Sequence, residues 1–436
     1  MSRKLALVMA FGILMPAAAA RAQSSKLAFI IPDLYGPNGL KVDSAALLPN
    51  GQTHSAHFNS AFQAEFTQFN IALASQLAAV PLPSPASGFT FSLDSSLGVM
   101  KRSTQSFGPI YAERAETIGK KKFSVGVSFQ RFTFDTIEGE SLGNIPAVFT
   151  HDDAAPGGRS DVISTANAID LRVNQSTLFV TFGVLDRLDL SLAVPYVNVD
   201  ISATSDATVE RIGTSSNPKV HFFADPAAAS VYGSEKTFTN SGSASGIGDL
   251  VMRLKGTVIK SGHTGLALGA DVRFPTGDEE DFLGSGATAV KPFLAWSLGA
   301  GKASPHVNLG YVWTGDSVLA GNVKTGEKKS LPDEFVWAGG LDIGGAERLT
   351  LAFDVLGRHV IDSPRLETKT FTALDGTTTL PDIRFVNGSF DVIDGAAGFK
   401  FNAGGKLLID FNVLFNLNNA GLRDKVTPLF GLEYSF

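Results

Sequence analysis

Single charged side chains recur at every second position of segments that are otherwise apolar. In the segment 264–276, Asp271 and Arg273 alternate with Val272 and Phe274. In a β-strand, successive side chains point to opposite faces, so the charged groups would share one face and the apolar groups the other. We therefore predict that the charged face lines the interior. The candidate lining residues are Asp170, Arg172, Asp189, Asp249, Arg253, Lys255, Asp271, Arg273, His306, Asp342, Asp354, Lys400 and Asp410.

This interior set contains both signs of charge. Neighbouring opposite charges could pair across the interior and serve only the structure. Alternatively, some of them could line a path for solutes, although a lining of one sign would be the clearer mark of ion selectivity. The residues alone leave both interpretations open.

Catalytic chemistry finds little support in the sequence. The seven histidines include His306, predicted to be a hydrogen-bonded interior residue, and none lies in a nucleophile elbow or a zinc-ligand pattern. The absence of cysteine excludes thiolate ligands and cysteine nucleophiles. The acidic run 278–281 does not have the spacing of a calcium loop. We therefore predict no enzymatic activity, no catalytic residues, no metal site and no cofactor.

The elements that carry these residues are predicted to be long β-strands. In the segment 405–418, Leu407, Ile409 and Phe411 alternate with Asp410 and Asn412, which is the period of a strand. Such segments run for roughly 11–14 residues, longer than the strands typical of soluble proteins and long enough to cross a membrane at a tilt.

The connections between these segments alternate between short and long. Short turns such as 183–186, 261–263 and 403–404 separate long polar loops, predicted at 136–167, 201–245, 276–287, 315–333 and 360–388. Short turns on one side and long loops on the other are typical of outer-membrane β-barrels. We predict an all-β, antiparallel, up-and-down transmembrane barrel over residues 88–436. About fourteen strands are favoured over twelve, the two additional ones being 89–99 and 109–118.

The N-terminal residues are predicted to direct export. Residues 1–22 have a basic start, a short apolar core and the small-x-small pattern Ala20-Arg21-Ala22, as in a signal peptide. Residues 23–87 form a predicted plug segment, in which apolar residues at three- and four-residue spacing indicate an amphipathic helix over 58–80. The residues that define this helix are Phe58, Phe62, Phe66, Phe69, Leu73 and Leu77. An alternative is that the helix only stabilises the barrel.

The end of the chain and its composition agree with this destination. Phe430, Tyr434 and Phe436 lie on one face of the last alternating segment, a pattern that resembles the C-terminal signal read by the outer-membrane assembly machinery. We therefore predict two partners, that machinery and outer-membrane lipid. The net charge of −6 argues against a nucleic-acid partner.

Three short motifs resemble a known family. They are Gly246-Ile247-Gly248-Asp249, Pro275-Thr276-Gly277-Asp278 and Leu283-Gly284-Ser285-Gly286. Together they are similar to outer-membrane proteins associated with the meta-pathway of phenol degradation, which resemble transporters of long-chain fatty acids and aromatic hydrocarbons. The resemblance implies a barrel for the passive uptake of small hydrophobic or aromatic compounds. The alternative is a barrel that transports nothing and acts through its outer loops as a surface or structural protein.

Overall fold

The computed structural model describes residues 26–35, 40, 91–94, 99–102, 106–150, 161–213, 221–223, 233–299 and 301–436. Among these residues the only helical element is the short 3-10 turn η1 (Leu27–Phe29), and no helix is long and apolar enough to span a membrane. The predicted signal peptide 1–22 and the predicted helix 58–80 lie outside the described residues.

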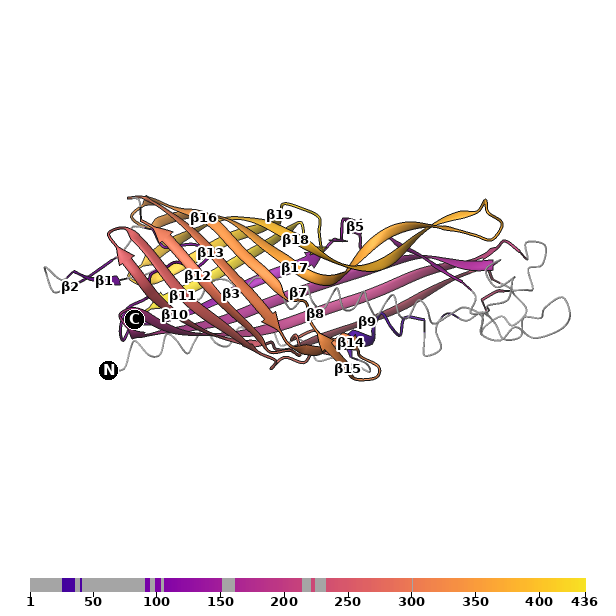
Figure 1. The fold of residues 1–436 in the computed structure, drawn as a ribbon, viewed down its shortest axis with the longest axis horizontal. Helices are drawn as coiled ribbons and strands as arrows, with labels where there is room; N and C mark the ends of the chain where they lie inside the picture. The colour runs from indigo at the N-terminus through magenta and orange to yellow at the C-terminus, as the bar shows by residue number, and fades with distance from the viewer. Residues whose placement is uncertain are drawn as a thin grey trace.

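The described chain is dominated by antiparallel strands (Figure 1). The strands of the barrel wall are β3 (Phe123–Phe134), β7 (Asp161–Leu185), β8 (Leu188–Arg211), β10 (Leu250–Ser261), β11 (Thr264–Phe274), β12 (Ala289–Leu298), β13 (Ala303–Thr314), β16 (Glu334–Ala346), β17 (Leu349–Thr372), β18 (Thr379–Gly404), β19 (Leu407–Asn416) and β21 (Val426–Ser435). The remaining strands are β1 (Phe91–Asp94), β2 (Val99–Arg102), β4 (Thr136–Ile137), β5 (Glu140–Ser141), β6 (Ile145–Phe149), β9 (Glu235–Ile247), β14 (Asp316–Asn322), β15 (Glu327–Ser330) and β20 (Leu422–Arg423).

Twelve strands close the barrel. The sheet runs from β7 through β3, β21, β19, β18, β17, β16, β13, β12, β11 and β10 to β8, and the pairing of β7 with β8 completes the cylinder. Two further strands, β6 and β9, belong to the same sheet but extend β7 and β8 beyond the cylinder. The predicted barrel is confirmed, while the favoured count of fourteen wall strands is corrected to twelve.

The two additional strands were misplaced for different reasons. In the segment 89–99, β1 pairs only with β2 and forms a separate hairpin, so the wall begins at Phe123 rather than at residue 88. The segment 109–118 contains no strand and lies inside the barrel. Its adjacent Glu113 and Arg114 would point to opposite faces of a strand, and one of the two charges would then face lipid.

The wall has the alternation that a membrane barrel requires. Along β11, Leu268 and Phe274 are exposed on the outside, whereas Asp271 is buried on the inside. Phe430, Tyr434 and Phe436 likewise lie on the outer, lipid-facing side. Because the cylinder closes on itself, its described wall strands leave no open sheet edge toward the bilayer.

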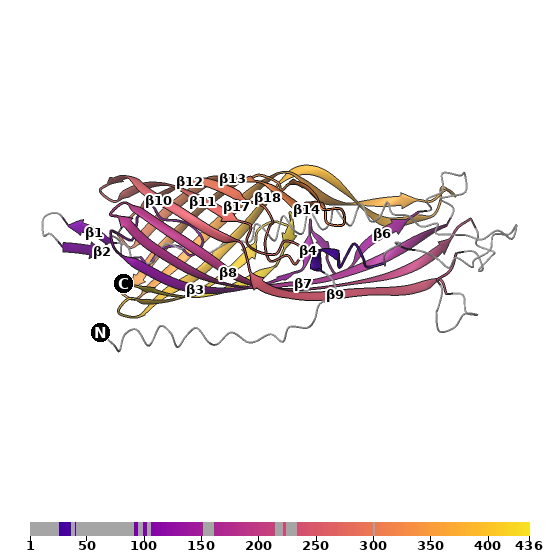
Figure 2. The ribbon, with the colours of Figure 1, turned by 90° about the horizontal axis from the view of Figure 1, so that it is seen from below.

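Several strands continue well past the cylinder on the side of the long connections (Figures 1 and 2). Strands β7, β8, β17 and β18 have 25, 24, 24 and 26 residues, far more than a membrane crossing needs. The distal parts of these strands, with β6 and β9, are called the outer extension. Much of the predicted loops 136–167, 201–245 and 360–388 is therefore strand.

In the outer extension the pattern of the membrane part is reversed, with apolar side chains on the inner face of the strands and polar side chains on the outer face. Val199 and Ile201 of β8 are buried toward the inside, while Asp200 and Ser202 alternate with them on the outside. Water surrounds this region, so polar groups suit the outer face and apolar groups are buried within. The outer extension therefore encloses an apolar interior.

Candidate functional site

An extended segment inside the barrel crosses its lumen near the periplasmic end, the end that carries the short turns. This segment, residues 106–118, is called the strap, and it leads into β3. Its polar groups bond to inward-facing wall residues. Phe107 N donates to Thr350 Oγ1 at 2.9 Å, and Ile118 N donates to Asp189 Oδ2 at 2.9 Å. Bonds to widely separated strands hold the strap across the lumen.

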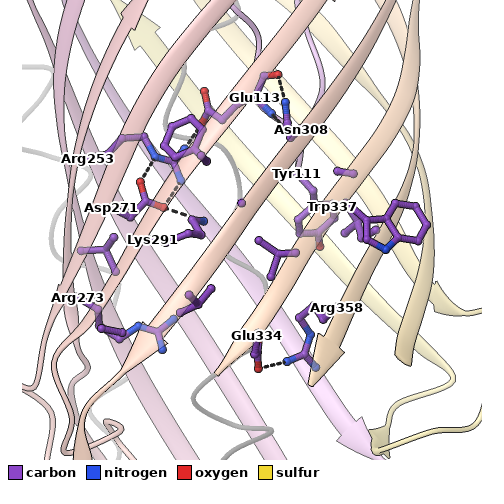
Figure 3. A pocket seen from close by; sticks show the side chains of 18 of the residues that line it. Tyr111, Glu113, Arg253, Asp271, Arg273, Lys291, Asn308, Glu334, Trp337 and Arg358 are labelled. Carbon is purple, nitrogen blue, oxygen red and sulfur yellow. Dashed lines mark hydrogen bonds and ion pairs between the residues drawn. The ribbon is translucent and has the colours of Figure 1, made fainter. Parts of the chain in front are cut away.

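Glu113 of the strap is the centre of one buried charge cluster. Its carboxylate accepts a hydrogen bond from Lys255 Nζ at 2.9 Å and pairs with Arg253. Arg253 also donates to Asp271, whose second oxygen lies 2.7 Å from Lys291 Nζ. Figure 3 shows Glu113 of the strap close to Arg253, Asp271 and Lys291, which come from β10, β11 and β12. The opposite charges offset the cost of removing each one from water.

Arg114 is the strap residue of a second cluster, closer to the periplasm. Its guanidinium lies 3.0 Å from Asp342 Oδ2. His306 stands between two carboxylates, with Nε2 at 2.6 Å from Asp354 and Nδ1 at 3.8 Å from Asp342. Adjacent residues of the strap thus anchor it to two different parts of the wall, β10 and β16.

Beyond the strap the lumen contains a cavity of about 240 Å³. Its charged lining includes Arg253, Arg273, Lys291 and Arg358 together with Glu113, Asp271, Glu334 and Asp394. Apolar side chains share the same surface, among them Phe179 and Phe293. A wall that combines apolar surface with a few placed charges is typical of a small-molecule site.

The residues of the three motifs meet at the outer edge of this cavity. Asp249 lies where β9 ends and β10 begins, and its carboxylate accepts hydrogen bonds from Gly277 N at 3.1 Å, Ser285 N at 2.7 Å and Ser285 Oγ at 2.6 Å. A Cβ on Gly284 would overlap this carboxylate. The three motifs therefore form one hydrogen-bonded structural cluster, the Asp249 cluster.

The N-terminal residues 26–35 lie in the outer extension. Lys26 Nζ lies 2.5 Å from Asp278 and 2.8 Å from Asp281, hydrogen bonds that raise the pKa of its amine. Leu27 and Ile30 are buried in the apolar interior. Burial also raises the pKa of the Tyr35 phenol, which donates to Asn167 Oδ1 at 2.9 Å. Two carboxylates of the acidic run 278–281, Asp278 and Asp281, are thus paired with Lys26 of the same chain.

Most predicted lining residues do point inward, but two do not. Asp170 and Arg172 lie on the outer face of β7 in the outer extension, about half exposed and 2.5 Å from each other. Their prediction as lumen residues is corrected: outside the bilayer, the charged positions of an alternating strand belong to the water-facing side. Lys400 and Asp410 are opposite each other on β18 and β19 and line a separate, smaller cavity of about 40 Å³.

Some residues of the site escaped the sequence-based prediction. Glu113 and Arg114 were assigned to a wall strand, and Lys291, Glu334 and Arg358 were not singled out. Two adjacent opposite charges, Glu113-Arg114, were the available signal, because no wall strand can place both in the lumen. Lys291 was also detectable, since it alternates with the apolar Val290 and Pro292.

The closed cylinder, its apolar outer belt and its charged interior define an outer-membrane β-barrel. Residues 151–326 match the model of a family described as "Putative MetA-pathway of phenol degradation", which confirms the resemblance found in the three motifs. No curated protein sequence matches the chain.

Solved structures of outer-membrane barrels are similar to this chain at low sequence identity. An outer membrane channel from Pseudomonas putida F1 is 13% identical, with a TM-score of 0.48 over 74% of this chain and 99% of that one. The toluene transporter TbuX of Ralstonia pickettii is 12% identical, with a TM-score of 0.32 over 74% and 92%. A Pseudomonas aeruginosa FadL homologue is 10% identical, with a TM-score of 0.31 over 73% and 91%.

Proposed function

We propose that the barrel mediates the passive uptake of small hydrophobic or aromatic compounds across the outer membrane. The observation that carries this proposal is the apolar interior of the outer extension, which includes Val199, Ile201 and Phe238. A channel for polar solutes would present polar groups to the incoming molecule. The apolar side chains of the outer extension pack together with Leu27 and Ile30, and an apolar solute that enters among them is removed from water, which is favourable in proportion to the apolar area buried.

The lumen between the outer extension and the strap supports the same proposal. A barrel of twelve strands lies between filled eight-stranded barrels and open porins with 16–18 strands. The strap occupies the periplasmic part of the lumen, and the cavity of about 240 Å³ lies between the strap and the outer extension. The matched family, described by a pathway of phenol degradation, favours aromatic substrates. In a non-transporting surface barrel the same apolar interior would only stabilise the outer extension, and the matched family does not favour that alternative.

A tryptophan at Ala289 tests this route. Ala289 faces the cavity and is buried, so Ala289→Trp would fill part of the space through which a solute passes. We expect the uptake of naphthalene by cells that carry the barrel to fall nearly to the level of cells without it. Intact cells are needed because their lipopolysaccharide leaflet slows unassisted permeation.

The matched control is Val290→Trp, which places the same side chain on the exposed outer face of the neighbouring position. This variant should take up naphthalene like the wild type. Gel migration that differs between unheated and boiled samples would show that both variants are folded. Equal naphthalene uptake by folded Ala289→Trp and folded Val290→Trp would contradict the proposed route.

A further inference from the structure

The cavity lining carries four cations and four carboxylates, and two further cations outside the lining, Lys255 and Arg423, pair with carboxylates of the lining. The cations are Arg253, Lys255, Arg273, Lys291, Arg358 and Arg423. The carboxylates are Glu113, Asp271, Glu334 and Asp394. Asp249 adds a fifth carboxylate at the edge, where the amide N–H groups of Gly277 and Ser285 and the Ser285 hydroxyl bond to it. The numbers of opposite charges are therefore similar, and the pairing of these groups decides which cation is left without a partner.

The carboxylates that line the cavity are already engaged by other cations. Glu113 is shared by Arg253 and Lys255, and Asp271 is shared by Arg253 and Lys291. Glu334 pairs with Arg358 at 3.0 Å, and Asp394 pairs with Arg423. The lining therefore holds no carboxylate that is free to neutralise another cation.

Among the described residues that line the cavity, Arg273 is the cation without a counterion. It follows Asp271 by two positions on β11 and lines the same cavity, where Figure 3 draws its guanidinium without a bond. Its side chain forms no hydrogen bond or ion pair with any residue that the structure describes. A guanidinium presents its N–H donors in a rigid fork that matches a carboxylate. Arg273 can thus receive an anion that none of the described residues supplies.

The surface beside these charges suits an aromatic ring. The guanidinium carbon of Arg253 lies 5.0 Å from the ring centre of Phe293, and Lys291 Nζ lies 5.8 Å from it. Phe179 and Val251 also line the cavity. Cations above a ring and apolar walls beside it favour a ligand that has both an apolar body and a negative group.

We propose that this cavity binds small aromatic carboxylates, with Arg273 holding the carboxylate and the surface around Phe293 holding the ring. This proposal rests on the proposed uptake function and narrows its substrates to molecules that are apolar at one end and anionic at the other. Two features favour an organic acid over inorganic phosphate, namely the apolar lining and the single free fork.

Transport of benzoate into proteoliposomes tests the proposal. At pH 8 benzoate is charged and crosses the lipid slowly, and valinomycin with potassium removes any opposing membrane potential. We expect Arg273→Gln to reduce benzoate uptake about tenfold, the loss that follows from removing one charge-assisted hydrogen-bonded contact. Arg273→Lys keeps the charge but not the fork and should give an intermediate rate. The control Lys260→Gln removes an exposed cation at the periplasmic end of β10 and should resemble the wild type.

The same variants are then assayed for naphthalene uptake in cells, so that the two proposals can fail separately. A fall of about tenfold in the ratio of benzoate to naphthalene uptake for Arg273→Gln, relative to wild type, supports the proposal. Equal ratios overturn it. Naphthalene uptake without benzoate uptake in the wild type overturns the carboxylate proposal and leaves the proposed function standing, whereas uptake of neither compound overturns both.

Discussion

Replacing Glu113 with alanine is expected to release the strap and open the periplasmic end of the lumen. Glu113 is buried and is the acceptor for Lys255 and a partner of Arg253. Removing one partner of a buried charge cluster costs about 3–5 kcal/mol, because the remaining charges lose their compensation. That cost shifts the balance between the docked and the displaced strap on the order of a hundredfold or more.

Single-channel recording in planar bilayers measures this effect. The Glu113→Ala barrel should conduct more than the wild type, while Glu347→Ala, which removes an exposed carboxylate at a periplasmic turn, should not. Gly183→Ala is expected to displace the end of the strap by a different route, since a Cβ at this position would overlap the carbonyl oxygen of Gly119, which directly follows the strap. Unchanged conductance in both Glu113→Ala and Gly183→Ala would show that the strap does not close the lumen.

The second large effect is expected at Asp249. Asp249→Ala leaves the N–H groups of Gly277 and Ser285 without an acceptor in a buried site. Each buried donor left unsatisfied costs about 1–3 kcal/mol, so a loss of about 3 kcal/mol in the free energy of unfolding is expected. The Asp249 cluster joins β9, β10 and the connection from β11 to β12. Loss of its hydrogen bonds should therefore also loosen the outer edge of the cavity.

Urea titration followed by the heat-dependent shift in gel migration measures this loss. Asp249→Asn keeps a carbonyl acceptor and should be less destabilised than Asp249→Ala. Asp206→Ala is the control, since Asp206 is exposed and bonds only to Thr237 among the described side chains. If Asp249→Ala and Asp206→Ala unfold at the same urea concentration, the Asp249 cluster does not contribute the expected share of the free energy of unfolding.

Strict alternation made the membrane-spanning part of the fold predictable. Leu407, Ile409 and Phe411 lie on the outer face of β19 as their spacing indicates, because lipid outside and charge inside impose a simple rule. The same rule predicts an inward position for Arg253, Asp271 and Arg273, which line the cavity in the structure.

The rule failed wherever its surroundings changed. Beyond the bilayer, water faces the outer side of the strands, so Asp170 and Arg172 lie outside. Within the lumen, the strap does not face lipid, and it carries the adjacent charges of Glu113 and Arg114. The alternation rule for a membrane strand therefore does not apply to it. Pairing across the lumen depends on the register of distant strands, which is why Glu113 could not be matched to Arg253 and Lys255 from sequence.

Comparing the uptake of an apolar and a polar solute of similar size tests the account most directly. Cells that produce the barrel, and cells that do not, would be supplied with labelled naphthalene or labelled glucose. The apolar interior of the outer extension predicts that the barrel accelerates naphthalene uptake much more than glucose uptake. An equal or greater acceleration of glucose uptake would contradict the account and indicate a general porin instead.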